Sequence, residues 1–89
     1  MSEARRIDQW LWFARIVKSR SQAQRLIAEG QVRINRVKVD KPGKEIAPGD
    51  FITAFVHERI RVLKVVASGN RRGPATEAQS LYEEVRDGG

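Results

Sequence analysis

The stretch Arg6–Val39, RIDQWLWFARIVKSRSQAQRLIAEGQVRINRVKV, changes its hydrophobic period and thereby decides the fold. In its first part, apolar residues recur every three or four positions, which is typical of helices. After Gly30 they alternate every second residue, which is typical of strands. Glycine often ends a helix because it adopts a positive φ without strain. The stretch therefore predicts helices followed by a β-hairpin.

The first helix is predicted over residues 7–17. The apolar residues that would share one of its faces are Ile7, Trp10, Leu11, Ala14 and Val17. Trp12 and Phe13 lie beside this face, so we expect more than one neighbouring element to cover the helix. Asp8 falls in the first turn, where the helix dipole favours a carboxylate.

The second helix is predicted over Arg20–Glu29. Ser19 and Gln22 have the spacing of a capping box, in which the serine oxygen and the glutamine side chain satisfy unpaired amides. Gly30 follows at the position where helices commonly end. The residues expected to face inward are Ala23, Leu26 and Ile27.

Strands are predicted after this helical hairpin. Val32 and Ile34 alternate with polar residues, and so do Val37 and Val39, while Asn35-Arg36 between them has the length of a tight turn. Two further strands are predicted over Phe51–Val56 and Ile60–Val66, joined by His57-Glu58-Arg59. The predicted fold class is α+β, with a two-helix hairpin packed on a small, mostly antiparallel sheet.

The C-terminal part of the chain is predicted to form a separate helix. Residues 68–75 have the composition of a linker, and Thr76 with Gln79 resembles another capping box. A helix over residues 76–87 would then turn its apolar side chains toward Trp12 and Phe13. The side chains of that stripe are Ala78, Leu81, Tyr82 and Val85.

Composition limits the classes of function. The 89 residues include no cysteine and one histidine, His57, so thiolate and histidine metal sites lack their ligands. No Gly-rich phosphate loop or nucleophile–base pair is present, so we expect no enzyme, no metal and no cofactor. No apolar run has the length of a membrane span or the pattern of a signal peptide. We therefore expect a cytoplasmic protein.

Basic residues are concentrated in one part of the chain. The 17 Lys and Arg residues exceed the 11 Asp and Glu residues by six, and residues 5–38 hold nine of the former and two of the latter. Residues 76–89 are acidic, with one basic and four acidic side chains. Such a positive field attracts polyanions, although a solvated basic surface without a ligand is the alternative.

The candidate nucleic-acid surface combines cations with amide and hydroxyl groups. Guanidinium groups can bind phosphates with two hydrogen bonds, and Ser, Gln and Asn can add contacts to phosphate, ribose or bases. Arg15 and Arg25 could each serve only to pair with Glu29 or a helix end. For Trp12 we favour packing over base stacking. The candidate residues are Arg6, Lys18, Arg20, Ser21, Gln24, Arg25, Gln31, Arg33, Asn35 and Lys38.

Several of these residues form motifs that resemble the S4-like RNA-binding domain, also called the αL motif. The motifs are Arg6-Ile7-Asp8, Lys18-Ser19-Arg20-Ser21 with Ala23, Gly30-Gln31-Val32-Arg33-Ile34-Asn35, and Ala47-Pro48-Gly49-Asp50. Arg36 departs from the pattern, because glycine is usual there. The resemblance covers about residues 5–67, which we take as the S4-like domain.

The segment 8–15 and the tail from Arg71 to Glu84 resemble, more closely, the bacterial heat-shock-protein-fifteen family. This resemblance implies binding to ribosomal RNA on the free large ribosomal subunit carrying peptidyl-tRNA, in the rescue or recycling of stalled subunits. We expect a monomer that could bind DNA weakly. Some members extend further at the C-terminus in a basic tail. The alternatives are a protein–protein interaction module and a general DNA or RNA binder.

Overall fold

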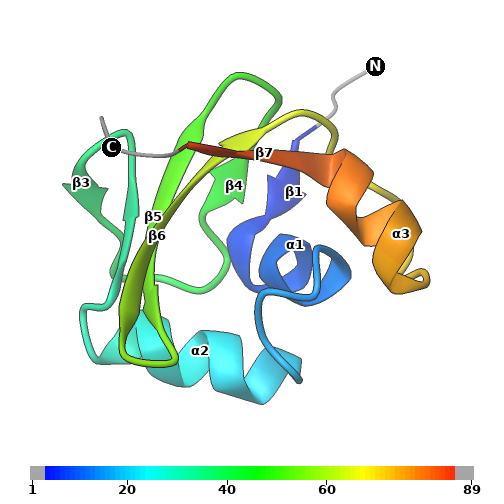
Figure 1. Cartoon of the computed structure of the whole chain (residues 1–89). Coiled ribbons are helices and arrows are strands. Elements are labelled where there is room, and N and C mark those ends of the chain that lie inside the picture. Colours follow the sequence, from blue (N-terminus) through cyan, green and yellow to red (C-terminus); the bar gives the residue numbers. More distant parts are fainter. Residues whose placement is uncertain (1–3, 86–89) are drawn as a thin grey trace.

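A five-stranded antiparallel sheet forms the centre of the structure, a computed structural model that describes residues 4–85 (Figure 1). Its strand order is β3 (Val37–Lys38), β2 (Val32–Ile34), β5 (Phe51–Val56), β6 (Arg59–Val65) and β7 (Tyr82–Val85). A second, two-stranded sheet joins β1 (Arg5–Arg6) to β4 (Glu45–Ile46). The sheet and the helices that pack on it confirm the predicted α+β class.

Helix α1 spans Ile7–Phe13 and is shorter than the helix predicted over residues 7–17. Arg15 has a φ of 59° and ends the helix in the left-handed conformation. The amide of Ile16 then donates to the carbonyl of Leu11 at 3.0 Å, as in a Schellman motif. Ile16 and Val17 are nevertheless buried, because this turn directs the chain back into the core.

Helix α2 spans Arg20–Ala28 and has the predicted ends to within one residue. The Gln22 amide donates to Ser19 Oγ at 3.1 Å, and Gln22 Oε1 accepts from the amide of Lys18 at 2.8 Å. Gly30 has a φ of 75°, and the amide of Gln31 donates to the carbonyl of Leu26. The predicted cap and glycine stop are confirmed.

The β2–β3 turn has the predicted position. Asn35 and Arg36 have φ values of 50° and 72°, which match the twist of a two-residue hairpin turn. Val37 is an exception to the predicted pattern. Its alternation with polar residues suggested an inward side chain, but Val37 is 69% exposed because β3 is an edge strand of two residues. Val39, just beyond this strand, is buried.

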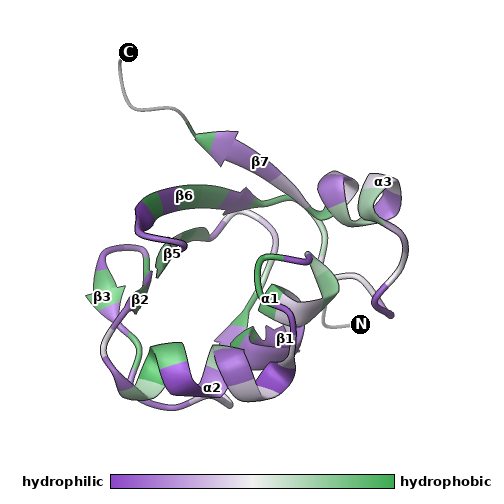
Figure 2. Cartoon of the chain, turned by 60° about the horizontal axis from the view of Figure 1, so that its bottom comes forward, coloured by the Kyte–Doolittle hydropathy of each residue, from purple (hydrophilic) through white to green (hydrophobic). Residues whose placement is uncertain are grey.

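The helix predicted over residues 76–87 is wrong beyond Leu81. Helix α3 spans only Ala75–Ala78, its N-cap is Pro74 rather than Thr76, and a 3₁₀ turn η1 (Gln79–Leu81) follows. The chain then continues as β7, which pairs with β6 at the sheet edge (Figure 2). Residues 86–87 of the predicted helix lie outside the described residues. The division of the chain at residue 67 stays a prediction.

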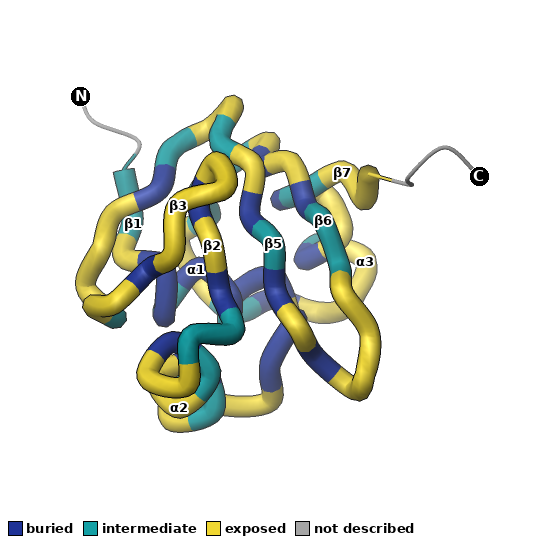
Figure 3. Tube along the Cα trace, turned by 90° about the vertical axis from the view of Figure 1, so that its left-hand side faces the viewer, coloured by how far each residue is buried: buried dark blue, intermediate teal, exposed yellow. Residues whose placement is uncertain are grey.

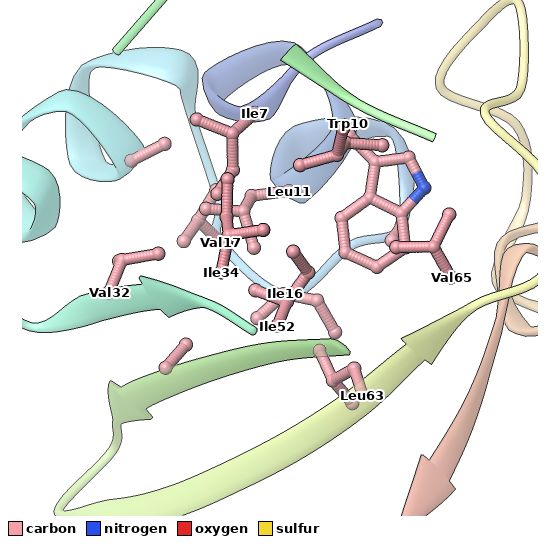
Figure 4. Close-up of a cluster of buried hydrophobic side chains, with 14 of the residues drawn as sticks. Ile7, Trp10, Leu11, Ile16, Val17, Val32, Ile34, Ile52, Leu63 and Val65 are labelled. Atoms are coloured by element: carbon pink, nitrogen blue, oxygen red, sulfur yellow. The ribbon is translucent and has the colours of Figure 1, made fainter. Parts of the chain in front are cut away.

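The core lies between the sheet and the helices α1 and α2 (Figure 4). Trp10 is completely buried, and its indole Nε1 donates to the carbonyl of Ala67 at 2.9 Å. Leu81 joins the same core and lies with Phe13 against Gly69, where a Cβ would be 3.1 Å from Leu81 Cδ1. The tail therefore does reach the neighbourhood of Phe13, although as a 3₁₀ turn and a strand.

Candidate nucleic-acid interface

The buried carboxylate of Asp8 gathers three of the ten predicted site residues. Its side chain has no exposed surface, and Oδ2 accepts from Arg6 Nη2 at 3.1 Å and from Gln24 Nε2 at 3.1 Å. Arg20 Nη2 lies 3.5 Å from the same oxygen. The amide of Gln9 donates to Oδ1 at 2.8 Å. We call Arg6, Asp8, Arg20 and Gln24 the Asp8 cluster.

The charge of Asp8 is stabilised by these neighbours. Burial alone would raise the pKa of the carboxyl, but hydrogen bonds from Gln24 and Arg6, with the charges of Arg6 and Arg20, lower it below its ordinary value of 3.8. The carboxylate is therefore ionised at neutral pH. It fixes the two arginines while their side chains stay 49% and 41% exposed. The cluster thus presents oriented guanidinium groups to solvent.

The second group of predicted residues lies on the β2–β3 hairpin. Arg33 on β2 pairs across the strands with Lys38 on β3, and both are exposed. The Lys38 side chain lies over Gly30, where a Cβ would be 2.8 Å from Lys38 Cε. Gly30 therefore has two structural roles, because its positive φ ends α2 and its missing Cβ leaves room for the lysine. Gln31 is half-buried, and its carbonyl accepts from the amide of Phe55.

The remaining predicted residues differ in their surroundings. Lys18, Ser21 and Arg25 are exposed at the elbow and on α2, and no ion pair joins Arg25 to Glu29 within the described residues. No side-chain hydrogen bond or ion pair of residues 4–85 joins the Asp8 cluster to the hairpin group. The structure therefore shows two groups, connected through α2 and Gly30.

Asn35 already has partners inside the protein. Its Nδ2 donates to Asp50 Oδ1 at 3.1 Å, and its Oδ1 accepts from the amide of Phe51 at 2.9 Å. Asp50 Oδ2 in turn accepts from the amide of Ala47 at 2.9 Å. This network fastens the β2–β3 turn to the start of β5. The side-chain amide of Asn35 thus positions the hairpin. A contact of this side chain with RNA stays a prediction.

Three arginines attach the linker to the α1 region. Arg5 Nη2 donates to the carbonyl of Gly69 at 2.6 Å, and Arg15 Nε donates to that of Gly73 at 2.8 Å. Arg72 Nε donates to the carbonyl of Trp12 at 3.1 Å, and its guanidinium lies 5.6 Å from the centre of the indole ring. Arg15 therefore has a structural partner, and Trp12 packs under Arg72 as favoured above.

Sequence reasoning missed two residues of this surface. Asp8 was interpreted as a residue that suits the helix dipole and as part of the Arg6-Ile7-Asp8 motif but not as a site residue, although Arg6, two positions earlier, hinted at an ion pair. Arg36 was interpreted only as a departure from the glycine that is usual in this turn, yet it lines the same concavity as Arg33 beside the hairpin turn. Its charge was the only available signal.

Residues 4–85 contain no group of three or more histidine, cysteine or acidic side chains that could hold a metal ion. Among the helices of that range, none has the length and apolar character needed to cross a bilayer.

Comparisons with known proteins agree with this geometry. The S4 domain family matches residues 5–52. A heat shock protein 15 homolog from Aeromonas salmonicida is 39% identical over 80 residues, which are 90% of this chain and 60% of that protein. An RQC P-site tRNA stabilizing factor from Listeria innocua is 26% identical over 88 residues, 97% of this chain and 95% of the factor.

A solved structure shows the same fold. Heat shock protein 15 of Vibrio cholerae superposes with a TM-score of 0.87 at 35% identity, covering 93% of this chain and 83% of that one. That protein is described as trimeric, whereas we expected a monomer for this chain. This chain spans about three fifths of the length of the heat shock protein 15 homolog named above.

Fold, motifs and basic surface together define an S4-domain RNA-binding protein. The chain belongs to the S4 domain family and, within it, to the heat shock protein 15 family. This family is non-enzymatic, in agreement with the expectation from the missing catalytic groups.

Proposed function

We propose that this chain binds structured ribosomal RNA on the free large ribosomal subunit, in particular a subunit that still carries peptidyl-tRNA. It would act in the cytoplasm, in the rescue or recycling of stalled subunits. The Asp8 cluster carries the proposal, because a buried carboxylate holds Arg6 and Arg20 in place while leaving them exposed to a polyanion. The relatives named heat shock protein 15 and P-site tRNA stabilizing factor support the ribosomal target.

The chemistry of the surface suits a folded RNA. Side chains do not reach the bases in the narrow major groove of an A-form helix, so structured RNA is recognised through phosphates and 2′-hydroxyls. Arg20 and Arg33 can bind phosphates with two hydrogen bonds each, and Gln24 retains an amide oxygen that can accept from a hydroxyl.

The decisive experiment is sedimentation of the protein with separated ribosomal subunits, with and without peptidyl-tRNA. We expect the protein to sediment with large subunits and to be enriched on those that carry peptidyl-tRNA. Equal binding to small subunits would contradict the proposal. Competition with DNA and capture after nuclease treatment test the alternatives of a general nucleic-acid binder and a protein-interaction module.

A salt series tests the mode of binding. If about five phosphates are neutralised, the logarithm of affinity falls with the logarithm of salt concentration at a slope of roughly −3 to −5. Filter binding to large-subunit RNA gives this slope directly. A salt-independent affinity would rule out a phosphate-directed surface.

A further inference from the structure

The outer face of the five-stranded sheet is not covered by a helix in the described residues (Figure 3). Helices α1 and α2 pack on the inner face, with the core between them and the sheet. On β5, the central strand, the alternation of side chains turns two aromatic rings outward. Phe51 is 41% and Phe55 42% exposed, although the contact of an apolar ring with water is unfavourable.

Each ring lines its own shallow concavity, and the two concavities adjoin. Arg36 and Thr53 line both of them. The first has a volume of about 430 Å³ and is also lined by Gly30, Gln31, Arg33, Phe55 and Ile60. The second has a volume of about 410 Å³ and is also lined by Asn35, Phe51, Val62 and Val85.

Cations border these concavities on the hairpin side. Lys38, Arg33 and Thr53 occupy one cross-strand row, and Arg36 lies in the adjoining turn. Lys38, Arg33 and Arg36 form no ion pair within the described residues. The acidic side chain on this face, Glu83, is at the opposite edge of the sheet, across from Lys64.

We infer that this outer sheet face binds single-stranded RNA. Unpaired bases would stack on Phe51 and Phe55, whose Cα atoms are roughly 13 Å apart along the strand. The phosphates between the bases would lie beside Arg33 and Arg36. Stacking on aromatic rings together with a positively charged groove is the general mode of binding for single strands. A purely apolar protein partner would leave Arg33, Arg36 and Lys38 without a counter-charge.

The inference rests on the proposed function, because Arg33 and Lys38 would belong to both surfaces. The hairpin would then connect a helical face for folded RNA with a sheet face for an adjoining unpaired segment. The two faces differ in their chemistry: the Asp8 cluster offers charge and hydrogen bonds, whereas the sheet face offers rings. They can therefore be tested separately.

The test compares two probes and three variants of the chain. The probes are oligouridine of about twelve nucleotides and a stable RNA hairpin. Phe51→Leu with Phe55→Leu keeps apolar bulk but removes the rings, and Phe51→Ala with Phe55→Ala removes both. Val37→Ala, an exposed apolar side chain outside both concavities, is the matched control.

We expect each ring to contribute a factor of about five or more to the affinity for oligouridine, so both double variants should bind it about twenty-five-fold more weakly or worse. Their salt slopes should match that of the parent chain, because no cation is lost. Their affinity for the RNA hairpin, and both affinities of Val37→Ala, should not change. Far-ultraviolet circular dichroism confirms that each variant is folded.

Four outcomes would overturn the inference. If the parent binds the hairpin but not oligouridine, the sheet face is wrong and the proposed function stands. If it binds neither RNA nor ribosomal subunits, both fail. If the leucine variant keeps its oligouridine affinity, the rings do not stack. If the phenylalanine variants lose self-association in sedimentation equilibrium while oligouridine binding persists, the face is an interface between copies of the chain.

Discussion

Asp8 connects the fold to the proposed interface, because its buried carboxylate is held by side chains of the interface itself. Replacing it by asparagine should lower the free energy of unfolding by about 1–3 kcal/mol, since charged hydrogen bonds are lost. The loss should be smaller than for a fully buried ion pair, because Arg6 and Arg20 can rehydrate. Urea unfolding measures this difference.

The matched control for this variant is Asp40→Asn, a change of the same chemistry at an exposed position. It should leave stability within about 0.5 kcal/mol of the parent chain. Asp8→Asn should also weaken RNA binding, because Arg6 and Arg20 are no longer held in one orientation. If Asp8→Asn unfolds no more readily than Asp40→Asn, the cluster does not stabilise the fold.

The lowered pKa of Asp8 makes a second prediction at the scale of the residue. A carboxyl whose pKa is lower in the folded than in the unfolded chain stabilises the fold above its unfolded pKa. That contribution is lost as the pH falls below 3.8 and through the folded pKa. The stability of the parent should therefore fall more steeply than that of Asp8→Asn below about pH 4. Urea midpoints between pH 6 and pH 2 measure the two slopes, and parallel slopes would contradict the assignment.

At the scale of the element, the ends of α1 and α2 show what a sequence can predict. Both helices end in a left-handed residue, Arg15 in one case and Gly30 in the other. Glycine signals such an end because it lacks a Cβ, so the end of α2 could be predicted. Arginine gives no such signal, and the apolar spacing through Val17 suggested that α1 continued. The buried positions were nevertheless right, because Val17 reaches the core from the turn.

The C-terminal element shows a different limit. The spacing of Ala78, Leu81 and Val85 suits a helix, and local patterns alone favoured one. Pairing with the open edge of β6 satisfies the backbone of residues 82–85 instead. Such a gain depends on a strand some twenty residues earlier and is invisible to a local pattern. Leu81 was still correctly predicted as an inward residue.

The β2–β3 turn provides a prediction at the same scale. Arg36 has a φ of 72°, which strains any residue with a Cβ. Arg36→Gly should raise the free energy of unfolding by about 0.5–1 kcal/mol, as relief of strain exceeds the entropy cost of glycine. Arg36→Ala removes the same charge but keeps the strain, so it should bring no gain. Thermal unfolding distinguishes the two variants, and equal melting temperatures would count against strain at this turn.

Across the whole molecule, the basic residues include two sets that a charge count cannot separate. One set bonds to the protein's own backbone, as Arg15 and Arg72 do through the carbonyls of Gly73 and Trp12. The other set faces solvent, as Arg33 does. The place of the interface, inferred from the motifs, stays a prediction, whereas the structural arginines depend on how the linker packs against α1. That packing joins residues far apart in the chain and leaves no local signal.

This division allows a test in which net charge is held constant. The pair Arg20→Ala with Arg33→Ala and the pair Arg15→Ala with Arg72→Ala each reduce the formal charge by two, from +6 to +4. We expect the first pair to weaken binding to large-subunit RNA and to make the salt slope shallower by about two units. The second pair should keep RNA affinity but lose about 1–3 kcal/mol of stability, because two part-buried hydrogen bonds to backbone carbonyls are removed.

Filter binding across a salt series and urea unfolding, applied to both pairs, measure these opposite effects. If both pairs weaken RNA binding equally, the overall field of the molecule drives association and the proposed surface is wrong. If only the first pair does so, affinity depends on where the charges are held. Because the net charges are equal, a difference in RNA affinity between the folded variants must come from the position of the arginines.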